Sequence, residues 1–171
     1  IVGASNLEKT FTINRKDISV TYTGTSHTYN GNYQGLTLTI SGYVTKDKAL
    51  FESNPLVYTH SGNTSNDVYS LASLKLTSVN AGSYNVKVVG LTSKFDNSNY
   101  RLSSTVDTTY TISPKTVTVS WSSNSLTYNG ETQYITPTIS SSSICTNVLT
   151  GNKDVVELTC SGNFGIDVTS Y

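Results

Sequence analysis

The chain contains no methionine, only three prolines and two cysteines, and no long apolar run. Its eleven Lys and Arg residues balance eleven Asp and Glu residues, so the formal net charge is zero. The chain therefore lacks the excess of basic residues that attracts nucleic acid or an anionic membrane surface. No apolar stretch approaches the roughly 20 residues that a spanning helix needs. We therefore expect no nucleic-acid partner and no membrane insertion in this segment.

The chain is rich in Ser, Thr and Asn, which together make up roughly two-fifths of it. These polar residues alternate with Val, Ile, Leu and Tyr, as in Ile18-Ser19-Val20-Thr21-Tyr22. Alternation with a period of two is typical of strands that bury one face. The sequence therefore predicts an all-β protein. Two cysteines in such a composition also suit an oxidising compartment, so we expect an extracellular location.

A repeated tetrapeptide divides the chain. Thr28-Tyr29-Asn30-Gly31 occurs again as Thr127-Tyr128-Asn129-Gly130, 99 positions later (127 minus 28), and the flanking residues repeat in the same register. Self-similarity at a fixed offset indicates a tandem repeat. We predict that residues 1–13 form the closing strand of a preceding repeat or a donor strand. Residues 14–113 then form a complete repeat and residues 114–171 an incomplete one, whose missing strands come either from further polypeptide or from a partner.

The complete repeat contains several segments with strand patterns, separated by turn signals such as Asn30-Gly31 and Ser61-Gly62-Asn63. A loop or a short helical turn, closed by Pro55, is expected over residues 47–55. The expected strands cover residues 18–22, 36–40, 56–60, 74–76, 84–88 and 100–112.

The segment from Asn80 to Val86 carries a further signal, in the order Asn80, Gly82, Tyr84 and Val86. This spacing resembles the tyrosine corner of immunoglobulin-like sandwiches. In that motif the Tyr hydroxyl bonds back to the turn backbone, and the residue two positions later points into the core. The alternative is an ordinary strand-entry Tyr after a Gly turn. The resemblance favours tandem immunoglobulin-like β-sandwich repeats as the fold class.

Several short elements in a fixed order resemble the MBG/YDG-type repeats, which are bacterial immunoglobulin-like modules of large surface proteins and adhesins. The elements are Tyr110-Thr111-Ile112-Ser113-Pro114-Lys115, the Tyr-Asn-Gly turn followed by Gln133, Ala81-Gly82-Ser83-Tyr84, and Asn99-Tyr100-Arg101-Leu102. The resemblance implies an extracellular stalk or adhesive fibre without catalytic residues. The chain departs from the common pattern in its enlarged section, residues 42–70, and in Arg15, where the next repeat has Pro114.

The residues that carry chemistry in other proteins have ordinary explanations here. Cys145 and Cys160 fall on or near neighbouring strands of one repeat, so we predict a disulfide between them, with two free thiols as the alternative. His27 and His60 have no ligand at metal spacing. Asp96-Asn97-Ser98-Asn99 reads as a solvated turn and not as a calcium loop. We predict no catalytic residue, no cofactor and no metal.

Three functions remain open from the sequence. The first is a structural stalk, in which the short linker Ile112-Ser113-Pro114-Lys115 limits swivelling between neighbouring repeats. The second is an adhesin module that grips glycan or host protein with residues 42–70. The third is a filament subunit whose residues 1–13 complete a neighbouring copy by strand addition.

Overall fold

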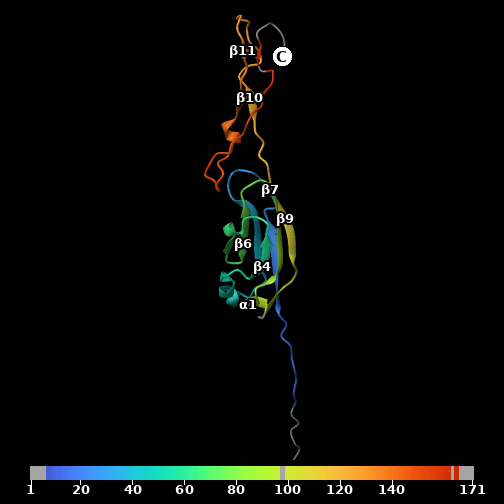
Figure 1. Ribbon diagram of the computed structural model, residues 1–171. Coiled ribbons are helices and arrows are strands. Elements are labelled where there is room, and N and C mark those ends of the chain that lie inside the picture. Colours follow the sequence, from blue (N-terminus) through green and yellow to red (C-terminus); the bar gives the residue numbers. More distant parts are fainter. Residues whose placement is uncertain (1–6, 97–98, 163, 166–171) are drawn as a thin grey trace, which may run out of the picture.

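A computed structural model describes residues 7–96, 99–162 and 164–165 of the chain. The molecule is elongated, with a strand-rich body in the middle (Figure 1). We call this body, residues 14–113, the N-terminal unit. The tail of residues 7–13 extends from one end of it, and residues 114–165, the C-terminal unit, extend from the other.

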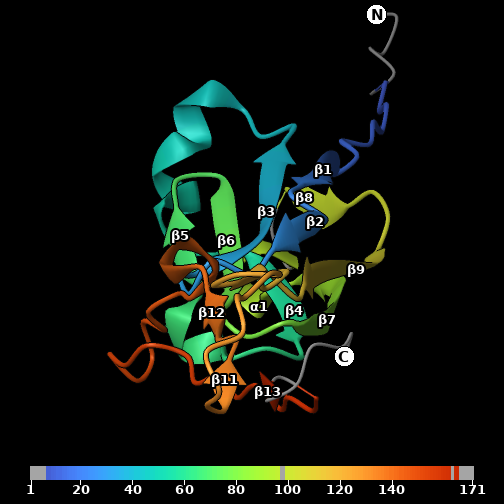
Figure 2. The same ribbon diagram turned by 90° about the horizontal axis from the view of Figure 1, so that it is seen from above.

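The N-terminal unit is a β-rich, sandwich-like fold of two sheets. The five-stranded sheet has the order β5-β6-β3-β1-β8, and the four-stranded sheet has the order β2-β9-β7-β4. Their strands are β1 (Lys16–Thr23), β2 (Ser26–Thr28), β3 (Gln34–Ser41), β4 (Leu56–His60), β5 (Val68–Ser70), β6 (Ser73–Ser78), β7 (Gly82–Leu91), β8 (Tyr100–Leu102) and β9 (Val106–Ser113). Among the described strands of this unit, only the pairs β1–β8 and β2–β9 are parallel. Figure 2 shows the unit along its long axis.

The core lies between these sheets and follows the alternation of the sequence. In β3, Leu36 and Leu38 are fully buried and Ile40 is 2% exposed, while the intervening Thr residues face outward or lie at the margin. Val86 and Val88 in β7 meet them from the other sheet. Complete burial of one such side chain contributes roughly 1.5–3 kcal/mol. An aromatic cluster around Phe51, Phe95 and Tyr100 fills the end nearest the tail.

The structure corrects the last strand that the sequence predicts. Residues 100–112 are not one strand, because β8 belongs to the five-stranded sheet and β9 to the four-stranded sheet. The chain crosses between the sheets at the polar residues 103–105, where the Ser103 amide donates to the Ile18 carbonyl over 2.8 Å. The short strands β2 and β5 were not expected, and each has only three residues.

The remaining short elements are helical. Where the sequence predicts a loop or helical turn, η1 (Thr45–Glu52) forms a 3-10 helix that ends before Pro55. The others in this unit are η2 (Thr64–Asn66) and α1 (Ser93–Asp96). Asn97 and Ser98, in the segment read as a solvated turn, lie outside the described residues. No helix in the described part of the chain is long and apolar enough to cross a membrane.

The C-terminal unit is much less compact. It contains two small sheets, which pair β10 (Val119–Trp121) with β12 (Pro137–Ile139) and β11 (Gln133–Tyr134) with β13 (Phe164–Gly165), and the 3-10 helix η3 (Ser141–Ser143). Ser143 is its one buried residue among those described. Val117, Ile135 and Ile139, which match the buried Ile18, Leu36 and Ile40 of the first repeat, are only partly buried. Trp121 and Tyr134 are 50% and 62% exposed.

Candidate functional site at the junction of the two units

The linker leads directly from a strand of one unit into the other unit. Ser113 ends β9, where it pairs with Thr28 of β2 and accepts a hydrogen bond from the Tyr29 amide over 2.8 Å. Pro114 follows at once, and its ring fixes one backbone angle. Lys115 then reaches the C-terminal unit, where its Nζ donates to the Ser142 carbonyl over 2.7 Å. The four linker residues therefore join two ordered segments and leave no free spacer.

A hairpin of the C-terminal unit folds back onto the N-terminal unit. We call residues 145–154 the junction hairpin. Thr146 and Lys153 form an isolated antiparallel bridge, and the Asp154 amide donates to the Cys145 carbonyl over 2.9 Å. The turn is closed by the Gly151 amide, which donates to the Asn147 carbonyl over 2.8 Å. These local bonds hold the side chains of Asn147 and Asp154 on the side that meets the N-terminal unit.

The hairpin docks on the first copy of the repeated tetrapeptide, residues 28–31, which we call the Tyr29 turn. Tyr29 Oη donates to Asp154 Oδ1 over 2.9 Å, and Asn147 Nδ2 donates to Tyr29 Oη over 3.3 Å. The Val148 amide donates to the Gly31 carbonyl over 2.8 Å. Burial first, and then the hydrogen bond to Asp154, raises the pKa of Tyr29. The phenol therefore stays protonated and keeps its role as donor.

Gly31 is required at this contact for two separate reasons. Its φ is +80°, a left-handed conformation that side chains disfavour. A Cβ at this position would also overlap the Thr146 carbonyl oxygen of the hairpin. The close approach of the two backbones therefore depends on the missing side chain.

The Asn80–Val86 segment lies at the same end of the N-terminal unit. Tyr84 Oη donates to the Asn80 carbonyl over 2.8 Å, and Val86, two residues later, is fully buried. The backward hydrogen bond that the spacing predicts is thus present. Asn80 has a second contact that the sequence did not indicate, because its Oδ1 accepts from Asn147 Nδ2 over 3.1 Å. The hydrogen bond from Tyr84 holds the backbone of Asn80 and so positions its side chain for the hairpin.

A cleft of about 320 Å³ lies between the two units. Its walls include Tyr29, Asn80, Pro114, Lys115 and Asp154. The polar groups among them are already bonded across or along the junction, so they serve to hold the units together. We therefore treat these residues as a joint between units and not as a ligand pocket.

Both cysteines are free thiols in the structure. Cys145 is half-buried at the start of the junction hairpin, where Lys115 Nζ lies 3.5 Å from its Sγ. Cys160 is exposed. The disulfide that we expected between them is not formed here, and it stays a prediction for the protein under oxidising conditions.

A second polar cluster lies inside the N-terminal unit, centred on His60. Its Nδ1 lies 3.1 Å from Asp67 Oδ1, and its Nε2 lies 2.8 Å from Tyr110 Oη. Tyr58 Oη donates to Asp67 Oδ2 over 3.1 Å, and Tyr110 Oη donates to Ser78 Oγ over 2.9 Å. The side chains of His60 and Asp67 are 0% and 3% exposed, so substrate has no access to them. We call these five residues the His60 network and regard it as structural.

The two histidines differ in their surroundings. His27 Nε2 lies 2.9 Å from the Gly24 carbonyl and 3.0 Å from the Gly35 carbonyl, so its hydrogen-bond partners among the described residues are backbone groups. His60 lies against the side chains of Asp67 and Tyr110 instead. Among the described residues, no group of three or more His, Cys, Asp or Glu side chains is placed to hold a metal ion.

The His60 network predicts a loss of stability at alkaline pH. Burial, and then the neighbouring Asp67 charge, raises the pKa of Tyr58 to about 12; burial is also the main cause that raises the pKa of Tyr110 to about 12. Both phenols ionise near pH 10 when unfolded, so their contribution is complete below pH 10 and is lost between about pH 10 and 12. Urea unfolding across this range measures the loss. The Tyr110→Phe variant should show a shallower decline, and an equal decline would contradict this assignment.

Sequence reasoning named the linker and the corner, but it missed the junction hairpin and the docking role of the Tyr29 turn. The repeated tetrapeptide was explained by turn geometry, for which Asn-Gly suffices. Repetition of the preceding Tyr was the available signal for a further role. Comparisons with protein-family models, curated proteins and solved structures give no match to this chain.

Proposed function

We propose that this chain is a non-enzymatic structural segment of an extracellular surface protein, built from tandem immunoglobulin-like β-sandwich units that form a stalk, fibre or filament. The observation that carries the proposal is the braced junction. The short linker and the hydrogen bonds from the junction hairpin to Tyr29, Gly31 and Asn80 restrict rotation between neighbouring units. A stack of units joined in this way transmits force along its axis.

Three further points support a structural role. The units lie end to end (Figure 1), which is the arrangement that a stalk needs. The internal repeat and the resemblance to MBG/YDG-type modules point to a longer array of the same kind, on the outside of a microbial cell. The His60 network contains His, Asp and Ser, the residue types of a hydrolase site, but it is buried in the core of the described structure.

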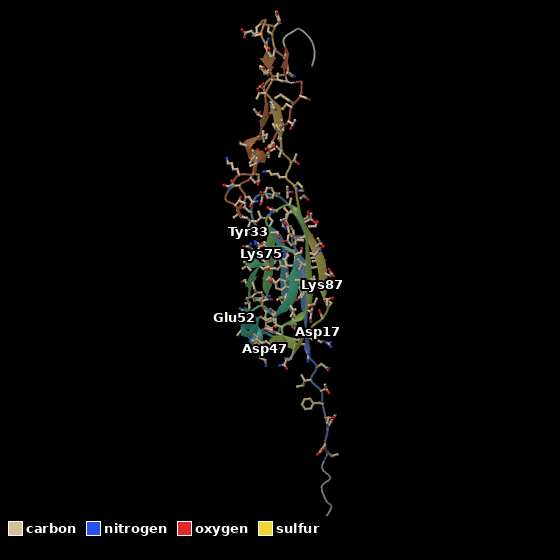
Figure 3. All side chains as sticks on the ribbon, in the orientation of Figure 1. Asp17, Tyr33, Asp47, Glu52, Lys75 and Lys87 are labelled. Carbon is tan, nitrogen blue, oxygen red and sulfur yellow. The ribbon has the colours of Figure 1, made fainter. Side chains whose placement is uncertain are left out.

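The enlarged section, residues 42–70, is built into the sandwich. It contributes β4 and β5 to the two sheets, and Phe51 is fully buried. Tyr69 Oη donates to the Phe51 carbonyl and Tyr100 Oη to Asp47 Oδ2, each over 2.6 Å. Figure 3 shows Asp47 and Glu52 at the end of the body opposite the C-terminal unit. These contacts favour a structural role for the section over a separate glycan-binding arm.

Strand donation by the tail is a second candidate, because one observation favours it. Leu7, Phe11 and Ile13 are 96%, 84% and 84% exposed, although their equivalents in the repeat, Val106, Tyr110 and Ile112, are buried in β9. Such a pattern suits pairing with another unit, either a preceding repeat or a neighbouring copy. Sedimentation at rising concentration tests pairing with a neighbouring copy, since deletion of residues 1–13 should abolish any assembly.

NMR relaxation of the 15N-labelled chain tests the stalk. In the native chain, amides of both units should fit one elongated rotating body. Tyr29→Phe removes the hydroxyl that contacts Asp154 and Asn147, and it should weaken the junction by about 1–2 kcal/mol. The units should then show separate rotational behaviour. Tyr128→Phe is the matched control. Tyr128 is 60% exposed, so this substitution should leave the coupling between the two units unchanged. Independent rotation in the native chain would refute the proposal.

A further inference from the structure

The second copy of the tetrapeptide, residues 127–130, forms the same turn as the first but has no unit docked on it in the described structure. We call it the Tyr128 turn. Asn129 Oδ1 accepts from the Glu131 amide over 3.0 Å, as Asn30 Oδ1 accepts from the Asn32 amide over 2.9 Å. The φ of Gly130 is +81°, against +80° at Gly31. The turn is therefore already in its docked conformation.

The surroundings of the two turns differ sharply. Gly31 is buried beneath the junction hairpin, whereas Gly130 is exposed. Among the described residues, a Cβ on Gly130 would meet only Tyr128 Oη, at 3.9 Å, while one on Gly31 would overlap the hairpin backbone. Tyr128 is 60% exposed. Gln133 Nε2 braces the open turn by donating to the Thr127 carbonyl over 2.8 Å and to Asn129 Oδ1 over 3.0 Å.

We propose that the Tyr128 turn is a docking site for the junction hairpin of another unit of this kind. The occupant is identified by the first copy of the site, where the same residue types hold residues 145–154. It must offer a carboxylate to Tyr128 Oη and a free backbone N–H to the Gly130 carbonyl, as Asp154 and Val148 do at the Tyr29 turn. The proposal rests on the proposed function, because it extends one observed junction into a periodic one.

The absence of a side chain at Gly130 is consistent with this role. An Asx turn with positive φ accepts Asn as well as Gly, so turn geometry alone does not demand Gly. Close backbone approach by a hairpin does demand it, as the overlap between a Gly31 Cβ and Thr146 shows. The two turns thus share a feature that only one of them uses within the described chain.

The test uses a backbone-cyclised peptide of residues 144–155, which keeps the hairpin ordered, added to the full 15N-labelled chain under reducing conditions. The amides of residues 128–131 should shift saturably, with Kd of about 1 mM, which a few exposed hydrogen bonds support. A control peptide with Asn147→Ala and Asp154→Ala should bind at least about tenfold more weakly. The Tyr29 turn should not respond, since its own hairpin occupies it.

A chain variant with the same two substitutions, Asn147→Ala and Asp154→Ala, calibrates the titration by freeing the Tyr29 turn. The native peptide should then shift both turns. Shifts at the freed Tyr29 turn alone would overturn the docking site, and shifts at neither turn would overturn recognition by the hairpin. Equal shifts with the native and the control peptide would also overturn recognition by the hairpin. These outcomes are independent of whether the two units of the native chain rotate together.

Discussion

Gly31→Ala is expected to open the junction between the two units, whereas Gly130→Ala is expected to leave it closed. Both substitutions place a side chain at a φ near +80°, at a cost of about 1–2 kcal/mol. Only at Gly31 does the new methyl group also overlap the Thr146 carbonyl oxygen. The new Cβ is fixed to the backbone of residue 31, and the Thr146 oxygen is itself a backbone atom, so neither can rotate out of the overlap. The hairpin must therefore move away from the turn.

Hydrogen exchange at the Val148 amide measures this opening directly. In the native protein that amide donates to the Gly31 carbonyl over 2.8 Å. Gly31→Ala should raise its exchange rate by about tenfold or more, which corresponds to loss of about 1.4 kcal/mol of protection. The Gly151 amide bonds within the hairpin to Asn147 and should keep its rate, since the hairpin itself survives.

Comparison of Gly31→Ala with Gly130→Ala separates the effect of backbone strain in the turn from the effect of the overlap with the hairpin. Equal acceleration at Val148 in both variants would mean that turn strain alone controls the junction, and the docking explanation would be wrong. Acceleration at Gly151 as well as Val148 in the Gly31 variant would mean that the hairpin depends on docking for its own folding. Neither result is expected from the local bonds that close the hairpin.

Much of the N-terminal unit was predictable because its strands alternate strictly. Leu36, Leu38 and Ile40 mark the buried face of β3, and Val86 and Val88 mark that of β7. The Asn-Gly turn and the Tyr84 spacing also depend only on neighbours in sequence. Local pattern therefore identified the all-β class, the long strands and the backward hydrogen bond of Tyr84.

Features that depend on distant partners could not be predicted in the same way. The alternation continues from Tyr100 to Ile112, yet the chain changes sheets because Leu102 pairs with Ile18 while Val106 pairs with Val88. The partner of Tyr29 is Asp154, 125 residues away. A side chain that already fits a turn gives no local sign of a second contact. The docking role of the turn therefore became visible only with the two units in place.

The partners of His60 could not be predicted from the sequence. Tyr110 lies in β9 and Asp67 follows η2, so the contacts join elements far apart in the chain. His60 and Tyr110 belong to the four-stranded sheet, whereas Asp67 directly precedes β5 and Ser78 ends β6 of the five-stranded sheet. The network thus connects the two sheets with directional bonds, which the hydrophobic core alone does not provide.

Asp67→Ala is expected to destabilise the N-terminal unit by about 2–5 kcal/mol. The substitution removes the acceptor of both His60 Nδ1 and Tyr58 Oη. Each buried donor left without a partner costs about 1–3 kcal/mol. Water cannot readily replace the carboxylate, because the side chains of His60 and Asp67 are 0% and 3% exposed. Urea unfolding of the native chain and the variant measures the difference as a shift of the midpoint.

Asp107→Ala is the matched control, since it makes the same chemical change at the surface of the same unit. Asp107 is 72% exposed and its Oδ2 lies 3.4 Å from Lys87 Nζ, so its loss should cost less than about 1 kcal/mol. Similar midpoints for the two variants would mean that the His60 network adds no stability. A large loss at Asp67 alone would mean that polar bonds between the sheets hold the unit together. In the proposed stalk, such bonds would resist sliding of one sheet over the other under load.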